Sequence, residues 1–387
     1  MKTYRSWKKL LTLLLAAGLV CCGGCHDTES PSLSSDDDTV SDTGELSSHT
    51  PLDPAADGIG KTLWICPRAI SNDNPYVTDS FIDQLTDAGR WPELLAHTAV
   101  LKLYIQQLYT TPEADLKRLA DFISAQNLQV AVELGGVRCA PAGTDPALLG
   151  EAAALEEYRH LAVFIAQGGR VDYITTDHAL AEGMAGRNPL FENMTMREMM
   201  DQQMAYYNYM LARIPDLRVG AIESLGYFQV KGDRQYQATD PTLPTIDFET
   251  YFNTLLDAAD DAGVTIDHFH IDFGYHDVKH DNGYGRILAV EDYVQSKGVH
   301  CGFIAGNAYH TGMAYPAEDE DAALRSAARN TAKYYDGYRK AGGHSDTLVF
   351  QRWQQYPILV GDESDPLTCM GIFHTLLHLA AGEELSE

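Results

Sequence analysis

The sequence predicts an α/β fold: a single (β/α)8 TIM-type barrel. From residue 59 onward, short runs of apolar and β-branched residues alternate with longer segments of helical periodicity. There are eight such short runs, and each begins 29 to 50 residues after the one before, which is the spacing of βα units. Apolar residues make up 45% of the 387 residues, enough to fill one large core. A doubly wound open sheet is the alternative.

The eight runs are the expected strands, and helix signals lie between them. Pro112 is expected at the first position of one helix, and Gly168, Gly263 and Gly342 follow the expected ends of others. The expected strands are Thr62–Cys66, Val100–Ile105, Gln129–Glu133, Tyr173–Thr176, Arg218–Glu223, His268–Asp272, Cys301–Ala305 and Thr347–Gln351. No second domain is needed, so we predict that residues 59–387 form one barrel.

The first 25 residues predict a secretory signal peptide. Four Lys and Arg residues within the first nine positions precede the apolar segment Leu10–Val20, which is too short to span a bilayer. Cys21 and Cys22 follow directly and resemble a bacterial lipoprotein signal, in which such a cysteine is lipidated. The resemblance implies lipidation at Cys22 or Cys21 and a membrane anchor in the cell envelope, on the periplasmic or outer-membrane face. Ordinary secretion is the alternative.

Residues 26–58 predict a disordered acidic linker. The stretch from His26 to Asp57 holds nine acidic residues and no Lys or Arg, a composition that cannot bury a core. The whole chain has 28 Lys plus Arg against 55 Asp plus Glu, a formal charge of −27, which would repel a phosphate backbone. Nucleic acid is therefore excluded as a partner. The four later cysteines form no Cys-x-x-Cys pair, so zinc-ribbon and redox functions lack support.

Four carboxylates stand at the ends of expected strands: Glu133, Asp177, Glu223 and Asp272. Active sites of (β/α)8 barrels lie at the carboxyl ends of the strands, so we expect all four side chains to face the barrel mouth. Acids that share one site disfavour each other's ionisation, and such clusters usually serve acid/base chemistry or a cation. For any one acid, pairing with an Arg or capping the next helix is the structural alternative.

Aromatic and polar residues near the strand ends suit a carbohydrate. Rings can stack on the C–H faces of sugars while amides and carboxylates bind the hydroxyls. A Trp or Tyr near a strand end can equally belong to the core. The expected substrate-binding residues are Glu133, Trp64, Tyr104, His178, Tyr227, Tyr275, His276, Asn307, Tyr309, Gln351 and Trp353.

On these residues, positions 59–387 resemble a (β/α)8-barrel glycoside hydrolase. The resemblance rests on the architecture, the strand-end acids and the segment Phe350-Gln351-Arg352-Trp353, where many such enzymes place a tryptophan at a subsite floor. In their largest clan an Asn precedes the acid/base on strand four and a Glu nucleophile ends strand seven. Here strand four reads Thr176-Asp177 and strand seven runs into Gly306-Asn307, so the chain departs from that pattern.

Glycosidic hydrolysis needs one protonated and one ionised carboxyl group. We expect Glu223 to be the general acid, because an apolar strand before it and aromatic residues after it would raise its pKa. Asp272 would be the ionised nucleophile or base, and Asp177 would be a third acid that orients substrate or modulates the other two. The resemblance implies hydrolysis of a polysaccharide or oligosaccharide at the cell envelope.

Two other functions stay open. In a metal-dependent sugar isomerase or lyase, Glu133, Glu223 and Asp272 with a histidine would hold a divalent cation. In a non-catalytic glycan-binding lipoprotein, the aromatics would matter and the acids would not. The loop Gly274–Ile287 has neither EF-hand nor HExxH spacing, so no metal and no cofactor are expected. The expected partners are a carbohydrate and, through the lipid anchor, a membrane.

Overall fold

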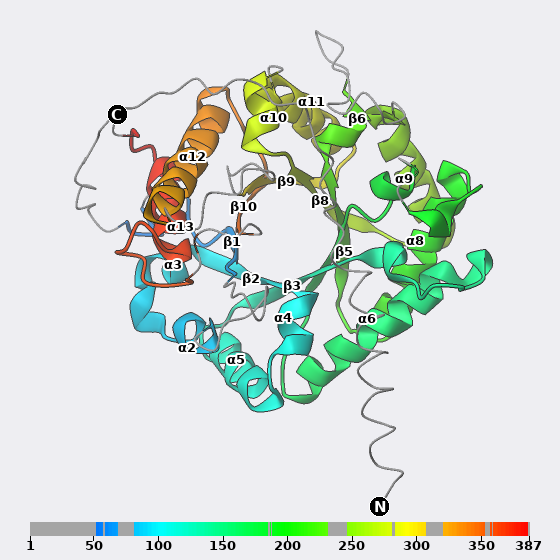
Figure 1. Cartoon of the computed structure of the whole chain (residues 1–387), viewed down its shortest axis with the longest axis horizontal. Helices are drawn as coiled ribbons and strands as arrows, with labels where there is room; N and C mark the ends of the chain where they lie inside the picture. Colours follow the sequence, from blue (N-terminus) through cyan, green and yellow to red (C-terminus); the bar gives the residue numbers. More distant parts are fainter. Residues whose placement is uncertain are drawn as a thin grey trace, which may run out of the picture. The chain divides into compact units, whose positions relative to one another are not determined.

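Eight parallel strands form a closed barrel at the centre of the computed structural model (Figure 1). The strands are β1 (Leu63–Cys66), β2 (Thr98–Tyr104), β3 (Gln129–Leu134), β4 (Tyr173–Asp177), β5 (Arg218–Ser224), β8 (Ile266–Asp272), β9 (His300–Ala305) and β10 (Thr347–Gln351). The structure describes residues 52–56, 59–68, 81–184, 186, 188–230, 246–280, 283–306, 320–352, 357 and 359–385. All eight expected strands are present.

The barrel closes between the first and last strands. Trp64 of β1 is in register with Val100 of β2 on one side and with Val349 of β10 on the other. Every neighbouring pair around the ring is parallel. The barrel prediction is therefore confirmed, and the open-sheet alternative is wrong.

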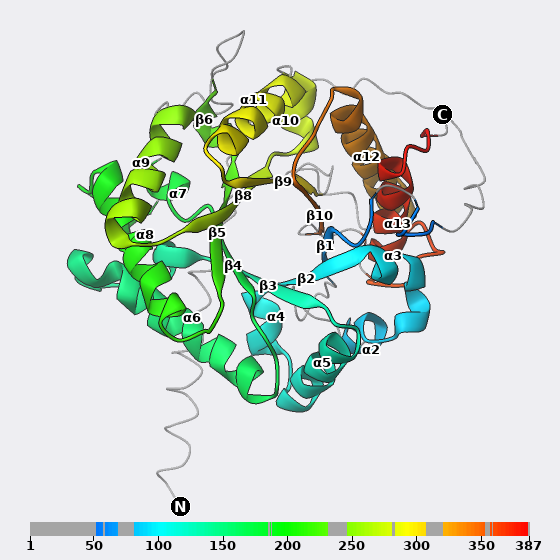
Figure 2. The same cartoon turned by 180° about the vertical axis from the view of Figure 1, so that it is seen from behind.

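Helices surround the barrel on its outside, as the two opposite views show (Figures 1 and 2). Gly263 ends one of them in the left-handed conformation at φ 66°, which glycine adopts without strain. Pro112, expected at the first helical position, is instead the N-cap of its helix, which begins one residue later, at Glu113. The helices are α2 (Phe81–Leu85), α3 (Pro92–His97), α4 (Ile105–Thr110), α5 (Glu113–Ala125), α6 (Leu149–Ala166), α7 (Ala181–Met184), α8 (Met196–Leu211), α9 (Phe248–Ala262), α10 (Tyr275–His280), α11 (Gly283–Ser296), α12 (Glu320–Lys340) and α13 (Cys369–Ala380).

The alternation of side chains along each strand separates the barrel interior from the helix layer. Because successive residues point to opposite faces, every second residue of a strand faces inward. Seven buried apolar side chains pack together inside the barrel: Trp64, Val100, Ala131, Tyr173, Ile222, Ile304 and Val349. Counting in steps of two from these residues identifies the inward positions near the mouth.

Two histidines of β8 share this interior with Trp64. The Trp64 ring lies 5.4 Å from the His268 ring and 4.9 Å from the His270 ring. Gly220 of β5 and Gly302 of β9 face these two imidazoles, and a Cβ atom at either glycine would overlap the ring opposite. The absence of side chains on the neighbouring strands is therefore what gives both imidazoles room inside the barrel.

Two features were not expected from the sequence. The short strands β6 (Phe228–Gln229) and β7 (Ile246–Asp247) form a separate parallel pair. Leu52 lies within the predicted linker, yet it packs against the hydrophobic core and its N–H donates a 2.6 Å hydrogen bond to Glu93 Oε1. The folded domain therefore includes Leu52, which lies before position 59.

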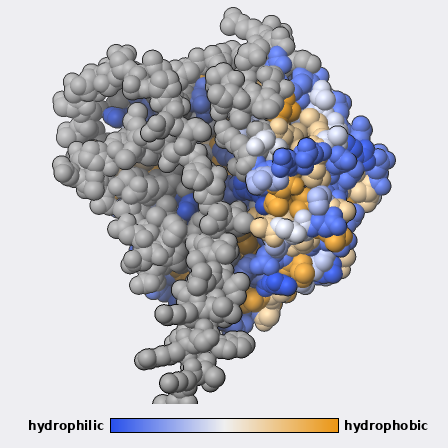
Figure 3. All heavy atoms as spheres, turned by 45° about the vertical axis from the view of Figure 1, so that its right-hand side comes forward, coloured by the Kyte–Doolittle hydropathy of each residue, from blue (hydrophilic) through white to orange (hydrophobic). Residues whose placement is uncertain are grey.

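The outer face of the helix layer mixes polar and apolar side chains. In Figure 3, apolar atoms form small areas separated by hydrophilic ones. Leu148, Leu155 and Val163, at the start of and along α6, are among the exposed large apolar residues. None of the helices within the described residues combines the length and apolar character that a membrane span requires.

Candidate active site

Asp177 and Asp272 are the terminal residues of β4 and β8, at the barrel mouth. On β4, Asp177 follows the inward Tyr173 in steps of two through Thr175, whose hydroxyl lies 3.0 Å from His268 Nε2 inside the barrel. On β8, Asp272 follows the inward pair His268 and His270. Both carboxylates therefore face the barrel axis, as predicted from their places at the strand ends.

His178 lies between these two carboxylates. Its Nε2 is 3.6 Å from Asp177 Oδ1 and 3.6 Å from Asp272 Oδ2, and it has no hydrogen-bond partner within the described part of the chain. The residue has a positive φ of 46°, and its N–H donates to Ile222 O across β5. This strained backbone holds an imidazole with an unused polar atom between two acids.

Arg138 orients the Asp177 carboxylate. It belongs to a short 3-10 helix, Gly136–Cys139, that follows β3. Its Nη2 donates a 2.8 Å hydrogen bond to Asp177 Oδ2, on the carboxylate oxygen that does not face His178. The other oxygen, Oδ1, therefore remains on the side of the imidazole.

A buried lysine holds Glu133 on the floor of the mouth. Lys102 Nζ lies 2.6 Å from Glu133 Oε2 and also donates a hydrogen bond to Gln351 Oε1. Gln351 Nε2 donates in turn to Glu133 Oε2 at 3.0 Å. Glu133 and Gln351, both expected in the site, thus form one network with Lys102, which the sequence analysis did not single out. The signal was a charged residue in the middle of the apolar strand β2.

Glu223 does not face the mouth in the way the sequence led us to expect. Ile222 belongs to the interior cluster, so the next residue on β5 points to the helix layer. There Tyr251 of α9 donates a 2.8 Å hydrogen bond to Glu223 Oε1, while Oε2 has no partner in the described chain. The carboxylate lies behind the wall of the barrel. Against the effect of burial, its charge adds to those of Asp177 and Asp272, which together raise the pKa of the His178 imidazole.

The surroundings separate the pKa values of these acids. Burial raises the pKa of Asp272 to about 6, against the opposing charge of His178. Burial also pushes the pKa of Asp177 upward, but the positive charges of His178, Arg138 and Lys102 outweigh it and hold that pKa below its ordinary value. Burial raises the pKa of Glu223 to about 7, in the direction that its apolar neighbours predicted.

The predicted aromatic contacts lie at different depths. The Tyr227 ring meets the His178 ring edge-on with centroids 6.0 Å apart, beside the acids. Tyr104 ends β2 at the mouth, where its hydroxyl donates to Arg352 O at 2.7 Å. Tyr275 opens α10 and is half-buried. Trp64 lies deeper, among the histidines of the barrel interior, so we leave it out of the site proposed below.

Part of the predicted site lies outside the described residues. Asn307, Tyr309 and Trp353 are in that part of the chain, as are Cys21 and Cys22, and the side chain of His276 is also not described. Their predicted roles in substrate binding and lipidation stay predictions.

Two clusters within the described residues bring together enough ligand atoms for a metal ion. One is at the mouth and consists of Asp177, His178 and Asp272, with one ligand atom from each within 4.8 Å of the others. This set contains Asp272 and a histidine, as expected for a metal enzyme. It lacks the other two expected acids, because Glu133 is paired with Lys102 and Glu223 faces the helices. The other cluster lies outside the barrel, between α3 and α13.

No family model and no curated protein sequence matches this chain. Among solved structures, an intracellular xylanase from Thermoanaerobacterium saccharolyticum JW/SL-YS485 matches with 13% identity and a TM-score of 0.46, over 76% of this chain and 86% of that one. Xylanase B from Clostridium stercorarium F9 matches with 13% identity and 0.39, over 67% and 80%. Deoxyribose phosphate aldolase from Aeropyrum pernix matches with 10% and 0.39, over 86% and 94%.

Proposed function

We propose that this protein is a glycoside hydrolase that acts on a polysaccharide or oligosaccharide, with Asp177 and Asp272 as its carboxylate pair. The observation that carries the proposal is the arrangement around His178: two inward carboxylates at the barrel mouth, on either side of one unpartnered imidazole nitrogen, with pKa values displaced in opposite directions. Paired acids with separated pKa values are what acid/base division of labour requires.

The two displacements assign the roles. Asp272, with its pKa raised to about 6, is the proton donor to the leaving glycosidic oxygen. Asp177, kept ionised by Arg138 and His178, attacks the anomeric carbon, and water then releases the sugar as Asp272 takes back a proton. This moves the acid from Glu223, the residue expected from the sequence, to the residue expected to be the nucleophile.

The spacing favours retention of configuration. Ligand oxygens of Asp177 and Asp272 lie within 4.8 Å of each other, whereas retaining glycosidases hold their carboxyl groups about 5–5.5 Å apart and inverting ones about 6.5–9.5 Å apart. The smaller separation leaves no room for a water between the sugar and a carboxylate that would activate it as a base. Proton NMR of the first product formed distinguishes the two outcomes.

A glycan panel with three variants tests the proposal. Asp177→Asn and Asp272→Asn should each lower turnover by about 10²-fold or more, since acid–base assistance contributes about 10²–10⁴. Glu223→Gln should stay within about tenfold of the parent, as should the control Asp201→Asn, which removes an exposed acid paired with Arg197 on α8. Loss of activity in Glu223→Gln with an active Asp272→Asn would instead restore the assignment made from the sequence.

The pH profile gives a second measurement on the same enzyme. The alkaline limb of kcat/KM should fall near pH 6, where free Asp272 loses its proton. In Asp272→Asn that limb should vanish with substrates whose leaving group departs without protonation. A profile that is unchanged in this variant would contradict the role given to Asp272.

A metal-dependent sugar isomerase or lyase is the second candidate. It is favoured by the placement of ligand atoms from Asp177, His178 and Asp272 within 4.8 Å of one another. Chelation separates the candidates, because a hydrolase that uses carboxylates alone keeps its activity in EDTA and a metal enzyme loses it. A protein that binds glycans and turns none of them over, with Asp272→Asn binding as well as the parent, would be the non-catalytic lipoprotein.

We further propose that lipidated Cys22 or Cys21 anchors the enzyme to a membrane of the bacterial cell envelope. The support is the leader sequence itself, with its positive start, its apolar segment and the cysteines that follow. The acidic segment between the anchor and the barrel would give the enzyme reach toward an insoluble or polymeric substrate.

A further inference from the structure

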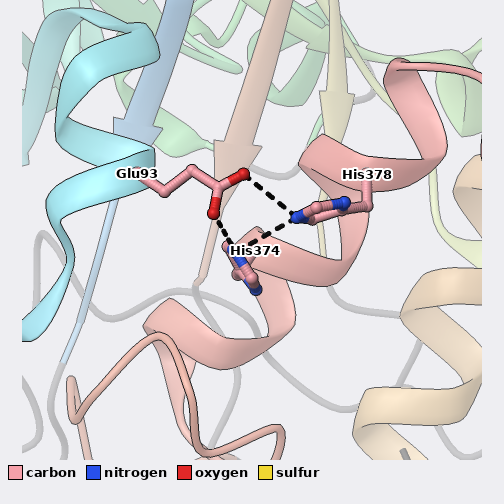
Figure 4. A group of neighbouring side chains, drawn as sticks. All are labelled: Glu93, His374 and His378. Atoms are coloured by element: carbon pink, nitrogen blue, oxygen red, sulfur yellow. Dashed lines mark hydrogen bonds and ion pairs between the residues drawn. The ribbon is translucent and has the colours of Figure 1, made fainter. Parts of the chain in front are cut away.

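The second cluster of ligand atoms joins two helices of the outer layer. His374 and His378 are one turn apart on α13, on the same face of the helix. Glu93 lies in the first turn of α3. Figure 4 shows the carboxylate and both imidazoles directed toward one another in the space between the helices. These residues are remote in sequence and have no part in the chemistry proposed at the mouth.

The three side chains already stand at the separations that metal ligands adopt. His374 Nε2 is 3.0 Å from Glu93 Oε2, His378 Nε2 is 3.1 Å from Glu93 Oε1, and the two Nε2 atoms are 3.2 Å apart. In a tetrahedral zinc site with bonds of about 2.0–2.1 Å, neighbouring ligand atoms lie about 3.3 Å apart. The triangle therefore matches one face of such a tetrahedron.

The protons of neutral imidazoles do not account for these contacts. His378 Nδ1 is 2.8 Å from Glu383 Oε1, and a carboxylate only accepts, so Nδ1 carries the proton. Neutral His378 then directs the lone pair of Nε2 at Glu93 and at His374. His374 Nε2 has at most one proton to offer. At least one contact in the triangle brings lone pairs together unless a cation is present or His378 is charged.

The surroundings orient the ligands as in metal sites. A histidine that binds metal usually donates its other N–H to a carboxylate, which fixes the tautomer and makes the ring more basic; Glu383 does this for His378. The N–H of Leu52 donates to Glu93 Oε1. Glu363 accepts hydrogen bonds from the N–H groups of Glu93 and Leu94 and so holds the start of α3 in place.

We propose that Glu93, His374 and His378 bind one transition-metal ion, with Zn²⁺ the best fit, and that this ion fastens the segment around Leu52 to α3 and α13. Two imidazoles and one carboxylate suit Zn²⁺ and its neighbours, whereas Mg²⁺ and Ca²⁺ prefer oxygen. The side chain of His378 is 1% exposed, that of Glu93 12% and that of His374 15%. An ion enters from the side of His374, and water completes the coordination.

The test uses the full chain, purified without a polyhistidine tag and stripped with chelator. Titration with Zn²⁺ should give one ion per chain by elemental analysis, and Mg²⁺ should not bind. Glu93→Gln and His374→Ala should each weaken Zn²⁺ binding at least tenfold, and Glu383→Ala, which removes only the carboxylate behind His378, should weaken it about 10- to 100-fold. His160→Ala is the matched control, because His160 lies on α6 and packs against Tyr109 with tilted rings; it should bind as the parent does.

Two measurements on the unaltered chain keep the proposal open to refutation if a variant fails to fold. Co²⁺ should give the intense visible absorption of a tetrahedral site, and Zn²⁺ should raise the melting temperature while chelator lowers it. The proposal is overturned if the stripped parent takes up no Zn²⁺, or if Glu93→Gln and His374→Ala bind as much Zn²⁺ with the same affinity. If Zn²⁺ binds but leaves the melting temperature unchanged, the ion does not fasten the segment around Leu52 to α3 and α13.

Discussion

At the scale of single residues, Glu223 is a carboxylate buried behind the barrel wall. Tyr251 supplies one hydrogen bond and Oε2 has none among the described residues. A charge there is poorly solvated, so burial raises its pKa from 4.5 to about 7. The folded protein therefore binds this proton more tightly than the unfolded chain does. Stability from this group is present below pH 4.5 and is lost as the pH rises toward 7.

Glu223→Gln should remove the loss of stability that the parent shows as the pH rises toward 7. The free energy of unfolding of the variant, relative to the parent, should increase by up to about 3 kcal/mol between pH 4 and pH 8, from about 1.4 kcal/mol per unit of pKa shift. Denaturant unfolding at several pH values measures it. Glu198→Gln supplies a control of opposite sign, since the hydrogen bonds from Thr195 lower the pKa of Glu198. A difference that stays constant with pH would contradict the account of Glu223.

The sequence predicted the positions of acids better than their directions. The places of Asp177 and Asp272 at strand ends could be predicted because the sequence itself shows an apolar strand followed by a polar loop. Successive residues of a strand point to opposite faces, so a shift of one residue decides whether Glu223 points inward. Only the structure, which places Ile222 inside the barrel, determines that direction. Trp64 was misplaced in depth for the same reason: its distance from the mouth is set by strand register.

The cluster of Glu93, His374 and His378 could be predicted from the sequence only in part. The spacing of His374 and His378 corresponds to one helical turn and could have been noticed. Glu93, however, precedes His374 by 281 positions, and only the closed barrel brings α3 beside α13. Lys102 is an intermediate case, because a lysine within an apolar strand signals an unusual environment without naming Glu133 as its partner.

At the scale of elements, the side chains of three neighbouring strands, β5, β8 and β9, fit closely against one another inside the barrel. Gly302 of β9 faces the His270 ring, and Gly220 of β5 faces that of His268. The imidazoles cannot retreat, because Trp64 packs against both. Strands β5, β8 and β9 therefore depend on one another through side-chain volume as well as through their hydrogen bonds.

Gly302→Ala should lower the free energy of unfolding by about 1–3 kcal/mol, the usual cost of overpacking a filled core. Adding His270→Ala should relieve part of that cost, so the double variant should lose less than the two single losses combined. Chemical denaturation measures all three. Gly89→Ala is the control, since its Cβ would meet only the Asp87 carboxylate at 3.3 Å on the surface. Additive losses would mean that the glycine and the imidazole do not share one space.

At the scale of the whole molecule, the acidic segment and the barrel meet near Leu52. Deletion of residues 26–50 should leave the melting temperature unchanged, because a charged segment poor in apolar residues has little to bury. Extending the deletion to residue 57 should lower it, since this removes Leu52 from the core and its N–H from Glu93. Calorimetry of both forms, with and without added Zn²⁺, decides the boundary; equal melting temperatures would place it after residue 57.

The proposed anchor is tested by substitution of Cys21 and Cys22 together by Ala. The doubly substituted protein should leave the membrane fraction, because its terminus can no longer carry acyl chains. Metabolic labelling with a fatty acid and fractionation of the cells measure the effect, and Cys25→Ala serves as the control. Membrane binding that persists without label would contradict the lipoprotein proposal.

Because β1 pairs with β10, the barrel cannot close during synthesis until the last strand has been made. Until Thr347–Gln351 has emerged from the ribosome, β1 and β9 each keep an edge with unpaired backbone groups, and such edges recruit other chains. The last contacts to form are also among the most distant in sequence, which slows folding. Chains that stop before residue 347 should therefore accumulate as aggregates and not as partial barrels, and a nascent chain needs protection until its final strand arrives.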